Sequence, residues 1–177
     1  MMAPILADES RARFRALALP LLPNMHRLAL ALTGNKARAE DLVQETYLRA
    51  LKYFYAYQGG DFRAWMAAIM RNLHRNQISA AMAMDNDEER LEAVPDPAPD
   101  PEQALLSLDR SQQLRRLIAA LPEGLRDVLV LREFGDLSYA QIAAMLAVPA
   151  GTVMSRLARA RESLRKAWVG AHDGSTT

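Results

Sequence analysis

An acidic, proline-rich segment divides the chain and limits what it can fold into. The stretch DNDEERLEAVPDPAPDPEQ, residues 85–103, contains four prolines at alternate positions. Residues 85–109 carry nine acidic groups and one arginine, a net charge of −8. Dense prolines favour an extended backbone and clustered carboxylates repel one another, so this segment cannot supply a core. We therefore predict a linker over residues 85–103 that joins two domains, residues 8–84 and 104–170.

Both predicted domains are basic, although the whole chain is nearly neutral. The formal net charge at pH 7 is +1. Residues 35–84 nevertheless carry +3, and residues 110–168 carry +5. Because the distribution of charge matters more than its sum, two basic blocks around an acidic segment favour a polyanionic partner such as nucleic acid.

Composition excludes several classes of protein. The chain has 177 residues, half of them apolar, so it can bury a core, but it has no run of eighteen apolar residues. Its first residues, MMAPILADES, lack the pattern of a secretory signal, and we expect a cytoplasmic protein without membrane insertion. Cysteine is absent, and the three histidines lack metal-ligand spacing. We therefore expect no disulfide, no metal and no cofactor.

The fold is predicted to be all-α, because no alternating β-branched run and no Asn-Gly hairpin turn occurs. In the first domain, Pro20 and Pro23 interrupt a helix that starts near Glu9, and Gly34 ends it. A second helix is expected over residues 36–54, and a third begins after Asp61 as N-cap. In the second domain, helices are expected over residues 103–120, 122–134, 138–146 and 149–168.

The segment AQIAAMLAVPAGTVMSRL, residues 140–157, has a pattern that one helix cannot explain. Ile142 and Leu146 share a face of a first helix, and Val153 and Leu157 share a face of a second. A small residue where they cross and a tight turn between them are typical of a helix-turn-helix. Pro149 fits the first turn of the second helix, where its missing N–H needs no partner.

The second of these helices is predicted to have one apolar and one polar face. The apolar stripe is expected to be buried and comprises Val153, Leu157, Ala160, Leu164 and Ala167. The polar face carries hydroxyls and arginines, which suit a major groove because arginine pairs with guanine edges or phosphates. Its candidate DNA contacts are Thr152, Ser155, Arg156 and Arg159. Arg161 and Arg165 lie on another edge and are assigned to phosphates or packing.

A helix of the first domain, AEDLVQETYLRAL at residues 39–51, also has two faces. Leu42, Val43, Thr46, Tyr47 and Ala50 lie on one side. Leu48 lies on the opposite, polar side. A leucine there is about equally consistent with a partner-binding surface and with a single hydrophobic side chain exposed by chance.

LSYAQIAAMLAVPAGTVMSRLARARESLR closely resembles the promoter-reading C-terminal domain of bacterial sigma factors of the extracytoplasmic function (ECF, group IV) family. The segment at residues 39–51 resembles the part of that family that binds core RNA polymerase, and FRAWMAAIMRNLHRN resembles its minus-10 helix. The resemblance spans about residues 10–168. It implies a region 2-like domain at 8–84, a region 4-like domain at 104–170, and minus-35 contacts by the four polar residues given above. The polymerase-facing set that it implies is Asp41, Gln44, Glu45, Leu48 and Arg49.

The resemblance also implies contacts with the minus-10 element. In that family the loop corresponding to YFYAYQGGD, residues 53–61, captures a flipped base, and aromatic side chains here can stack on one. Tyr53 and Phe54 are expected to pack inward instead. The stripe of Phe62, Trp65, Ile69 and Leu73 is interpreted as core. The implied minus-10 contacts are Tyr55, Tyr57, Gln58, Arg63, Arg71, Asn72, Arg75 and Asn76.

Three residues depart from the family pattern. Ala147 stands at a turn where glycine is usual, which costs about 1 kcal/mol if φ is positive there. Met154 stands where the family often has lysine, which predicts a missing phosphate contact. Asn76 replaces a frequent aspartate, and the basic cluster that commonly follows is reduced to SAAMAM.

The sequence thus predicts an ECF sigma factor with core RNA polymerase, promoter DNA and an anti-sigma factor as partners and no small-molecule substrate. One alternative is a stand-alone helix-turn-helix regulator that binds operators without polymerase. Another is a sigma mimic that sequesters an anti-sigma factor. An enzyme is disfavoured, because no nucleophile, base and metal occur together.

Overall fold

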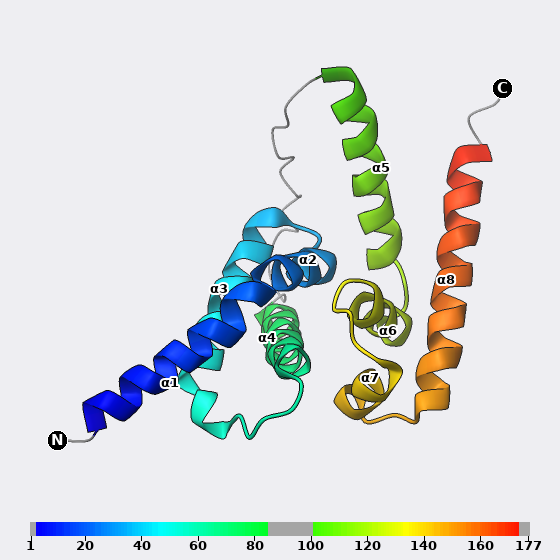
Figure 1. Cartoon of the computed structure of the whole chain (residues 1–177). Helices are drawn as coiled ribbons and strands as arrows, with labels where there is room; N and C mark the ends of the chain where they lie inside the picture. The colour runs from blue at the N-terminus through cyan, green and yellow to red at the C-terminus, as the bar shows by residue number, and fades with distance from the viewer. Residues whose placement is uncertain (1–2, 85–100, 174–177) are drawn as a thin grey trace. The chain divides into compact units, whose positions relative to one another are not determined.

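The computed structural model of the chain describes residues 3–84 and 101–173, all of whose regular elements are helical (Figure 1). The predicted all-α fold is thereby confirmed. The chain divides into two compact units, Met1–Arg90 and Leu91–Thr177. The predicted linker lies outside the described residues except for residues 101–103, which already belong to a helix.

Within residues 3–84, the first unit has four α-helices and two short 3-10 helices. They are α1 (Ala3–Ala18), η1 (Leu19–Leu21), α2 (Leu22–Thr33), α3 (Lys36–Lys52), η2 (Phe54–Ala56) and α4 (Phe62–Met84). The breaks fall where the sequence predicts them. Pro20 and Pro23 interrupt the first helical stretch, and Gly34 ends α2 in the left-handed conformation with φ 65°. Asp61 caps α4, since its Oδ1 accepts a hydrogen bond from the Ala64 N–H at 3.1 Å.

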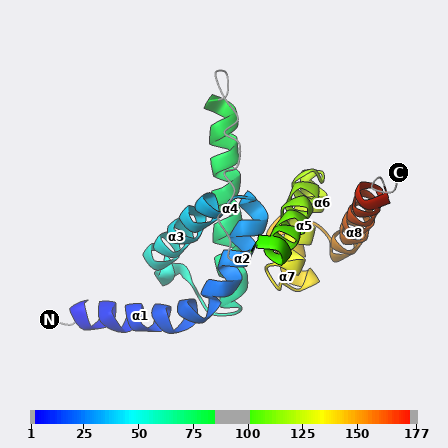
Figure 2. The same ribbon diagram turned by 90° about the horizontal axis from the view of Figure 1, so that it is seen from above.

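The core of the first unit lies between α2, α3 and α4. Met25, Leu28, Leu42, Met66 and Met70 are fully buried there. On the predicted inner side of α3, Leu42, Val43, Thr46 and Ala50 are buried and Tyr47 is half-buried. The buried face of α4 is centred on Met66 and Met70. The stripe that the sequence predicts as core lies beside these methionines. Its members Phe62 and Leu73 are buried, whereas Trp65 and Ile69 are half-buried. Beyond the core, α4 projects past α2 and α3 (Figure 2).

Tyr47 joins α3 to α1. Its hydroxyl donates a hydrogen bond to the carbonyl oxygen of Ala18 at 2.9 Å. Desolvation raises the pKa of Tyr47 to about 12. The phenol therefore stays a donor, and its hydrogen bond ties α3 to the backbone at the end of α1.

The part of the second unit that the structure describes, residues 101–173, has four helices: α5 (Pro101–Ala119), α6 (Glu123–Glu133), α7 (Tyr139–Leu146) and α8 (Ala150–Asp173). Their order and approximate bounds agree with those predicted. The largest fully buried side chains are aliphatic and come from α6, from the loop after it, and from the two helices of the predicted helix-turn-helix. They are Val128, Val130, Leu131, Leu137, Ile142, Val153 and Leu157.

The turn between α6 and α7 is tightly built. The N–H of Gly135 donates to the carbonyl oxygen of Val130 at 3.2 Å, and Asp136 follows with φ 54°. Arg132 donates through Nη1 to the carbonyl oxygen of Leu137 at 2.8 Å. A Cβ atom on Gly135 would lie 2.6 Å from the carbonyl oxygen of Leu131, so only glycine fits without a backbone shift.

α7, the first helix of the helix-turn-helix, is capped at both ends. At the start, the Ser138 hydroxyl accepts from the Gln141 N–H at 3.2 Å, and the Gln141 side chain accepts from the Ser138 N–H at 2.7 Å. At the end, Ala147 adopts φ 53° and ψ 45°, which is the left-handed conformation. The sequence-based concern about alanine at this position is therefore confirmed.

Replacing Ala147 with glycine is expected to raise the free energy of unfolding of the second unit by about 1 kcal/mol, because glycine removes the steric cost of the left-handed conformation. The chain has two tryptophans, and Trp168 belongs to the second unit. Urea unfolding followed by Trp168 fluorescence in a Trp65→Phe background measures the change. Ala144→Gly, on an exposed position inside α7, is the control and should change stability by a similar amount in the opposite direction.

α8 packs on the rest of its unit through the predicted apolar stripe, but only along its first half. Val153, Leu157 and Ala160 are buried. Leu164 is only half-buried, and the expected burial of Ala167 is wrong because that residue is exposed. The physical reason is length: α8 continues to Asp173, beyond the part of α6 and α7 that covers it.

Candidate nucleic-acid and polymerase interfaces

The polar face at the start of α8 is open to solvent. Ser155 and Arg159 are exposed, and Thr152 is half-buried. The Ser155 hydroxyl donates to the carbonyl oxygen of Thr152 at 3.1 Å. No hydrogen bond or ion pair within residues 3–84 and 101–173 involves the Arg159 guanidinium. Two of the four predicted minus-35 residues, Ser155 and Arg159, are thus exposed on this face, and Thr152 is partly accessible.

Arg156, the fourth of them, lies against a neighbouring helix. It is half-buried, and its guanidinium rests beside Gly124 at the start of α6. A Cβ atom on Gly124 would lie 3.5 Å from Nη1 and 3.6 Å from Cζ of Arg156, an ordinary contact distance. Helical spacing places Arg156 next to Ser155 but does not reveal this contact with α6.

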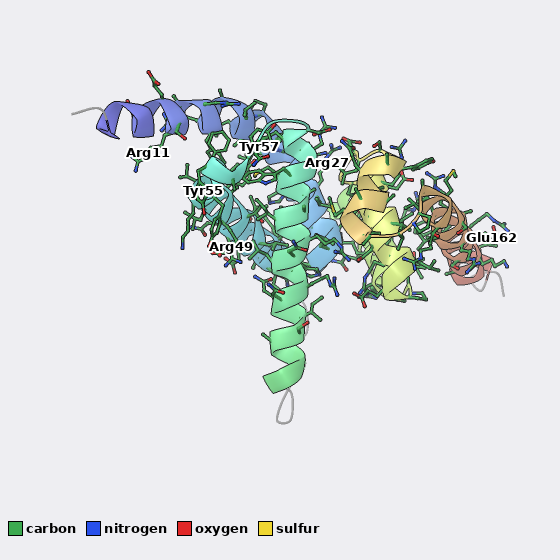
Figure 3. The ribbon with its side chains drawn as sticks, turned by 90° about the horizontal axis from the view of Figure 1, so that it is seen from below. Arg11, Arg27, Arg49, Tyr55, Tyr57 and Glu162 are labelled. Atoms are coloured by element: carbon green, nitrogen blue, oxygen red, sulfur yellow. The ribbon has the colours of Figure 1, made fainter. Side chains whose placement is uncertain are left out.

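Arg161 and Arg165 form ion pairs, in line with their predicted separation from the DNA-facing set. Arg161 donates to Glu133 Oε1 through Nε at 3.2 Å and Nη2 at 2.5 Å, and this hydrogen bonding raises the pKa of Arg161. Arg165 donates to Glu162 at 2.9 and 3.0 Å, which lowers the pKa of Glu162 (Figure 3). The first pair fastens α8 to the end of α6, whereas the second lies within α8.

The outer face of α3 carries the predicted polymerase-facing residues together. Leu48 is 58% exposed, and Leu51, which the sequence reasoning did not select, is exposed beside it. Asp41 and Gln44 are exposed on the same helix. An apolar side chain among exposed polar ones is the surface expected of a partner site. The remaining members, Glu45 and Arg49, form an ion pair at 3.3 Å.

The loop after α3 separates its aromatic residues into inward and outward groups. Phe54 is buried as predicted, but the inward packing expected for Tyr53 is wrong because that side chain is exposed. The Tyr53 ring lies 6.2 Å from the ring of Tyr55, which is 81% exposed. Tyr55 therefore offers the most accessible aromatic surface of the loop, on the same side of the unit as Arg49 (Figure 3). Gln58 is also exposed.

Tyr57 belongs to the aromatic cluster rather than to the open surface. Its ring lies 5.1 Å from Phe62 and 5.3 Å from Trp65, and it stacks on Phe54 at 5.9 Å. Its hydroxyl donates to the carbonyl oxygen of Gly60 at 2.6 Å. The cluster positions the loop, and a periodicity argument could not assign Tyr57 to it because the residue lies between helices.

The predicted minus-10 residues on α4 fall on more than one face. Asn72, Arg75 and Asn76 are exposed, so they are accessible to DNA. Arg63 is half-buried. Arg71 is only 9% exposed, so the structure gives no support to its assignment as a DNA contact.

A mainly apolar groove of about 440 Å³ lies between α5, α6 and α8. Its lining includes Leu114, Leu129, Leu164 and Trp168, with the Glu133–Arg161 pair at its edge. Arg165 lines it as well, whereas none of the residues predicted to contact the minus-35 element, the minus-10 element or polymerase does.

No group of three or more His, Asp or Glu side chains among residues 3–84 and 101–173 is arranged to hold a metal ion. In the same residues no single helix is long and apolar enough to cross a membrane; α7 and α8 taken together pass by length and composition, but they are bent by 102°.

Comparison with protein families gives two matches, one in each unit. The model described as sigma-70 region 2 matches residues 17–82, and the model described as sigma-70, region 4 matches residues 111–164. The first match covers α2, α3 and the exposed residues of α4. The second covers the helix-turn-helix and the polar face of α8.

Several curated proteins are similar over most of this chain. The ECF RNA polymerase sigma factor SigE of Mycolicibacterium smegmatis is 35% identical over 86% of this chain, which spans 60% of the length of SigE. EcfG of Rhodopseudomonas palustris is 33% identical, with 82% of this chain and 80% of EcfG covered. The sigma-H factor of Pseudomonas aeruginosa is 33% identical, with 86% of each chain covered.

A solved structure is also similar. It is the sigma factor RpoE of Bartonella quintana in complex with the anti-sigma factor NepR. The TM-score is 0.73 and the sequence identity is 27%, and the match covers 88% of this chain and 96% of that one.

Proposed function

This chain belongs to the ECF sigma factors of the sigma-70 family, and from that membership we propose that it directs core RNA polymerase to specific promoters and promotes initiation of transcription. The observation that carries the proposal is that each unit matches a different sigma region and exposes its own predicted contact face. Sigma region 2 and region 4 fall on separate units, and each exposes one of the predicted contact faces. In this proposal the polymerase, and not this chain, carries out the covalent chemistry. The chain acts in the cytoplasm.

In this proposal α3 binds core polymerase. The exposed Leu48 supplies apolar contact area, and Asp41 and Gln44 supply hydrogen-bonding groups around it. Central apolar contacts with a polar rim are typical of interfaces whose affinity depends on a few residues.

Promoter DNA is contacted by both units. Ser155 and Arg159 of α8 face the minus-35 duplex, and Tyr55 with Asn72 and Arg75 faces the minus-10 element. The exposed ring of Tyr55 suits an unstacked base, because stacking works on any accessible aromatic face. Two modest DNA sites held on one polymerase act at high effective concentration, which raises the affinity for promoters that contain both elements.

An anti-sigma factor is the expected regulator. The similar Bartonella quintana protein is bound by one. We propose that a partner of the same class holds this chain inactive by covering contact faces that polymerase and DNA require.

In vitro transcription with core polymerase over a library of promoters tests the proposal. Promoter-dependent transcripts that need both the chain and the core enzyme are the expected result. A chain that shifts duplex DNA in gels without polymerase and yields no transcripts would instead be a stand-alone regulator. A chain that binds an anti-sigma factor but supports no transcription would be a sequestering mimic.

A further inference from the structure

The aromatic cluster beside the loop at residues 53–61 takes one of its rings from the N-terminal helix. Phe14 of α1 is buried, and its ring lies edge-on to Phe54 at 5.3 Å and to Phe62 at 6.0 Å. The neighbouring Arg13 places its guanidinium 5.9 Å from the centre of the Phe54 ring. α1 therefore contacts this loop, which we call the minus-10 loop, although the two are far apart in the sequence.

Phe54 connects α1 to the rest of the minus-10 loop. Its ring stacks on Tyr57 at 5.9 Å, and the Tyr57 ring lies 5.1 Å from Phe62 at the start of α4. The Tyr57 hydroxyl donates to the carbonyl oxygen of Gly60 at 2.6 Å. Edge-to-face and offset arrangements of rings are the favoured ones, so these contacts hold the loop at both of its ends.

The exposed side chains of the minus-10 loop directly follow the anchored rings. Tyr55, which is 81% exposed, comes one residue after Phe54, and the exposed Gln58 comes one residue after Tyr57. The packed neighbours fix the backbone from which these two side chains project. A loop that is ordered before binding loses less conformational entropy when it binds a ligand, and its affinity is higher for that reason.

We propose that Phe14 is a positioning residue of the minus-10 site: it holds Phe54 and thereby keeps the exposed side chains of the loop in the arrangement that captures an unstacked base. The inference rests on the proposed function, because it takes the loop to contact the minus-10 element. It goes beyond that function by giving α1, which supplies none of the predicted contacts, a part in promoter opening.

Trp65 provides a test on the folded protein without DNA. Its ring belongs to the same cluster and lies 6.5 Å from the ring of Phe54. The chain has two tryptophans, so a Trp168→Phe background leaves Trp65 as the single fluorophore of that kind. Phe14→Leu keeps an apolar side chain but removes the ring. We expect acrylamide to quench Trp65 more efficiently in this variant, because the loop beside it is less firmly packed.

Binding of holoenzyme to two DNA fragments locates the effect. Promoters are first selected from a library with the parent holoenzyme. One fragment carries the selected minus-10 element as a single non-template strand, and the other carries only the upstream element as a duplex. Phe14→Leu is expected to bind the single-stranded fragment about fivefold to tenfold more weakly, because loop side chains must then be ordered on binding. Affinity for the duplex and for core polymerase should stay within a factor of about two.

Leu28→Val is the matched control, because it trims a fully buried side chain of α2. Urea unfolding sets a temperature at which both variants are folded, and there the control should match the parent in quenching and in binding. The proposal is overturned if Phe14→Leu leaves Trp65 quenching or single-strand binding unchanged, if it weakens binding to core polymerase equally, or if Leu28→Val shows the same losses. A parent holoenzyme that selects no promoter would instead contradict the proposed function.

Discussion

Replacement of Gly135 with alanine is expected to lower the free energy of unfolding of the second unit by about 1–3 kcal/mol, because the new methyl group overpacks a site closed by backbone. The added Cβ would lie 2.6 Å from the carbonyl oxygen of Leu131, and backbone cannot move aside as a flexible side chain can. The turn also sets the start of α7, so Leu137 and Ile142 would shift with it. Urea unfolding followed by Trp168 fluorescence in a Trp65→Phe background measures the loss.

Gly151→Ala is the matched control for this prediction. No atom lies within 4 Å of a Cβ built on Gly151, and this residue is in the first turn of α8. Alanine is favoured over glycine in a helix by up to about 1 kcal/mol, so this variant should be as stable as the parent or more so. Equal stability of Gly135→Ala and the parent protein would mean that the α6–α7 turn relaxes freely.

Leu48→Asp is expected to weaken binding to core RNA polymerase by roughly thirtyfold or more, as removal of a central interface residue does. The side chain is 58% exposed on α3, so the substitution leaves the core of the first unit intact. A carboxylate in its place has to be desolvated without a partner when the interface closes. Titration of fluorescently labelled protein with core polymerase measures the affinity.

Ile78→Asp serves as the control for Leu48→Asp. It introduces the same charge on an exposed apolar position of the first unit, but on the projecting part of α4. Its affinity for core polymerase should stay within a factor of about two, as is usual for substitutions outside an interface. Equal binding by Leu48→Asp and the parent protein would remove α3 from the proposed polymerase site, and circular dichroism of both variants checks that the helices persist.

Local sequence signals predicted most of the fold. Proline and glycine placed the breaks around α2, Asp61 placed the start of α4, and the change of apolar face at Pro149 placed the helix-turn-helix. These signals act within one or two turns of backbone, so they hold whatever the neighbouring helices do. The left-handed conformation of Ala147 was predicted in the same way, from its place between two helices.

Side-chain environments were harder to predict, because they depend on which neighbouring helix covers each sector of a surface. Arg71 shares α4 with accessible polar residues, yet it is buried. Tyr53 and Phe54 were both expected inside, but only Phe54, the first residue of the 3-10 turn after α3, is buried. Periodicity gives the angle of a residue about its own helix axis, but it carries no information on the distance to a second helix.

The contact between Arg156 and Gly124 has a consequence for how related sigma factors diverge. The arginine on α8 occupies space that glycine leaves open on α6, and a longer side chain at residue 124 would displace the guanidinium. A single change in α6 is thus expected to redirect a charge on the helix that we propose reads DNA. If α8 reads the minus-35 element as proposed, a substitution at residue 124 is expected to change promoter preference while the sequence of α8 stays the same. An alignment of α8 alone would not reveal that change.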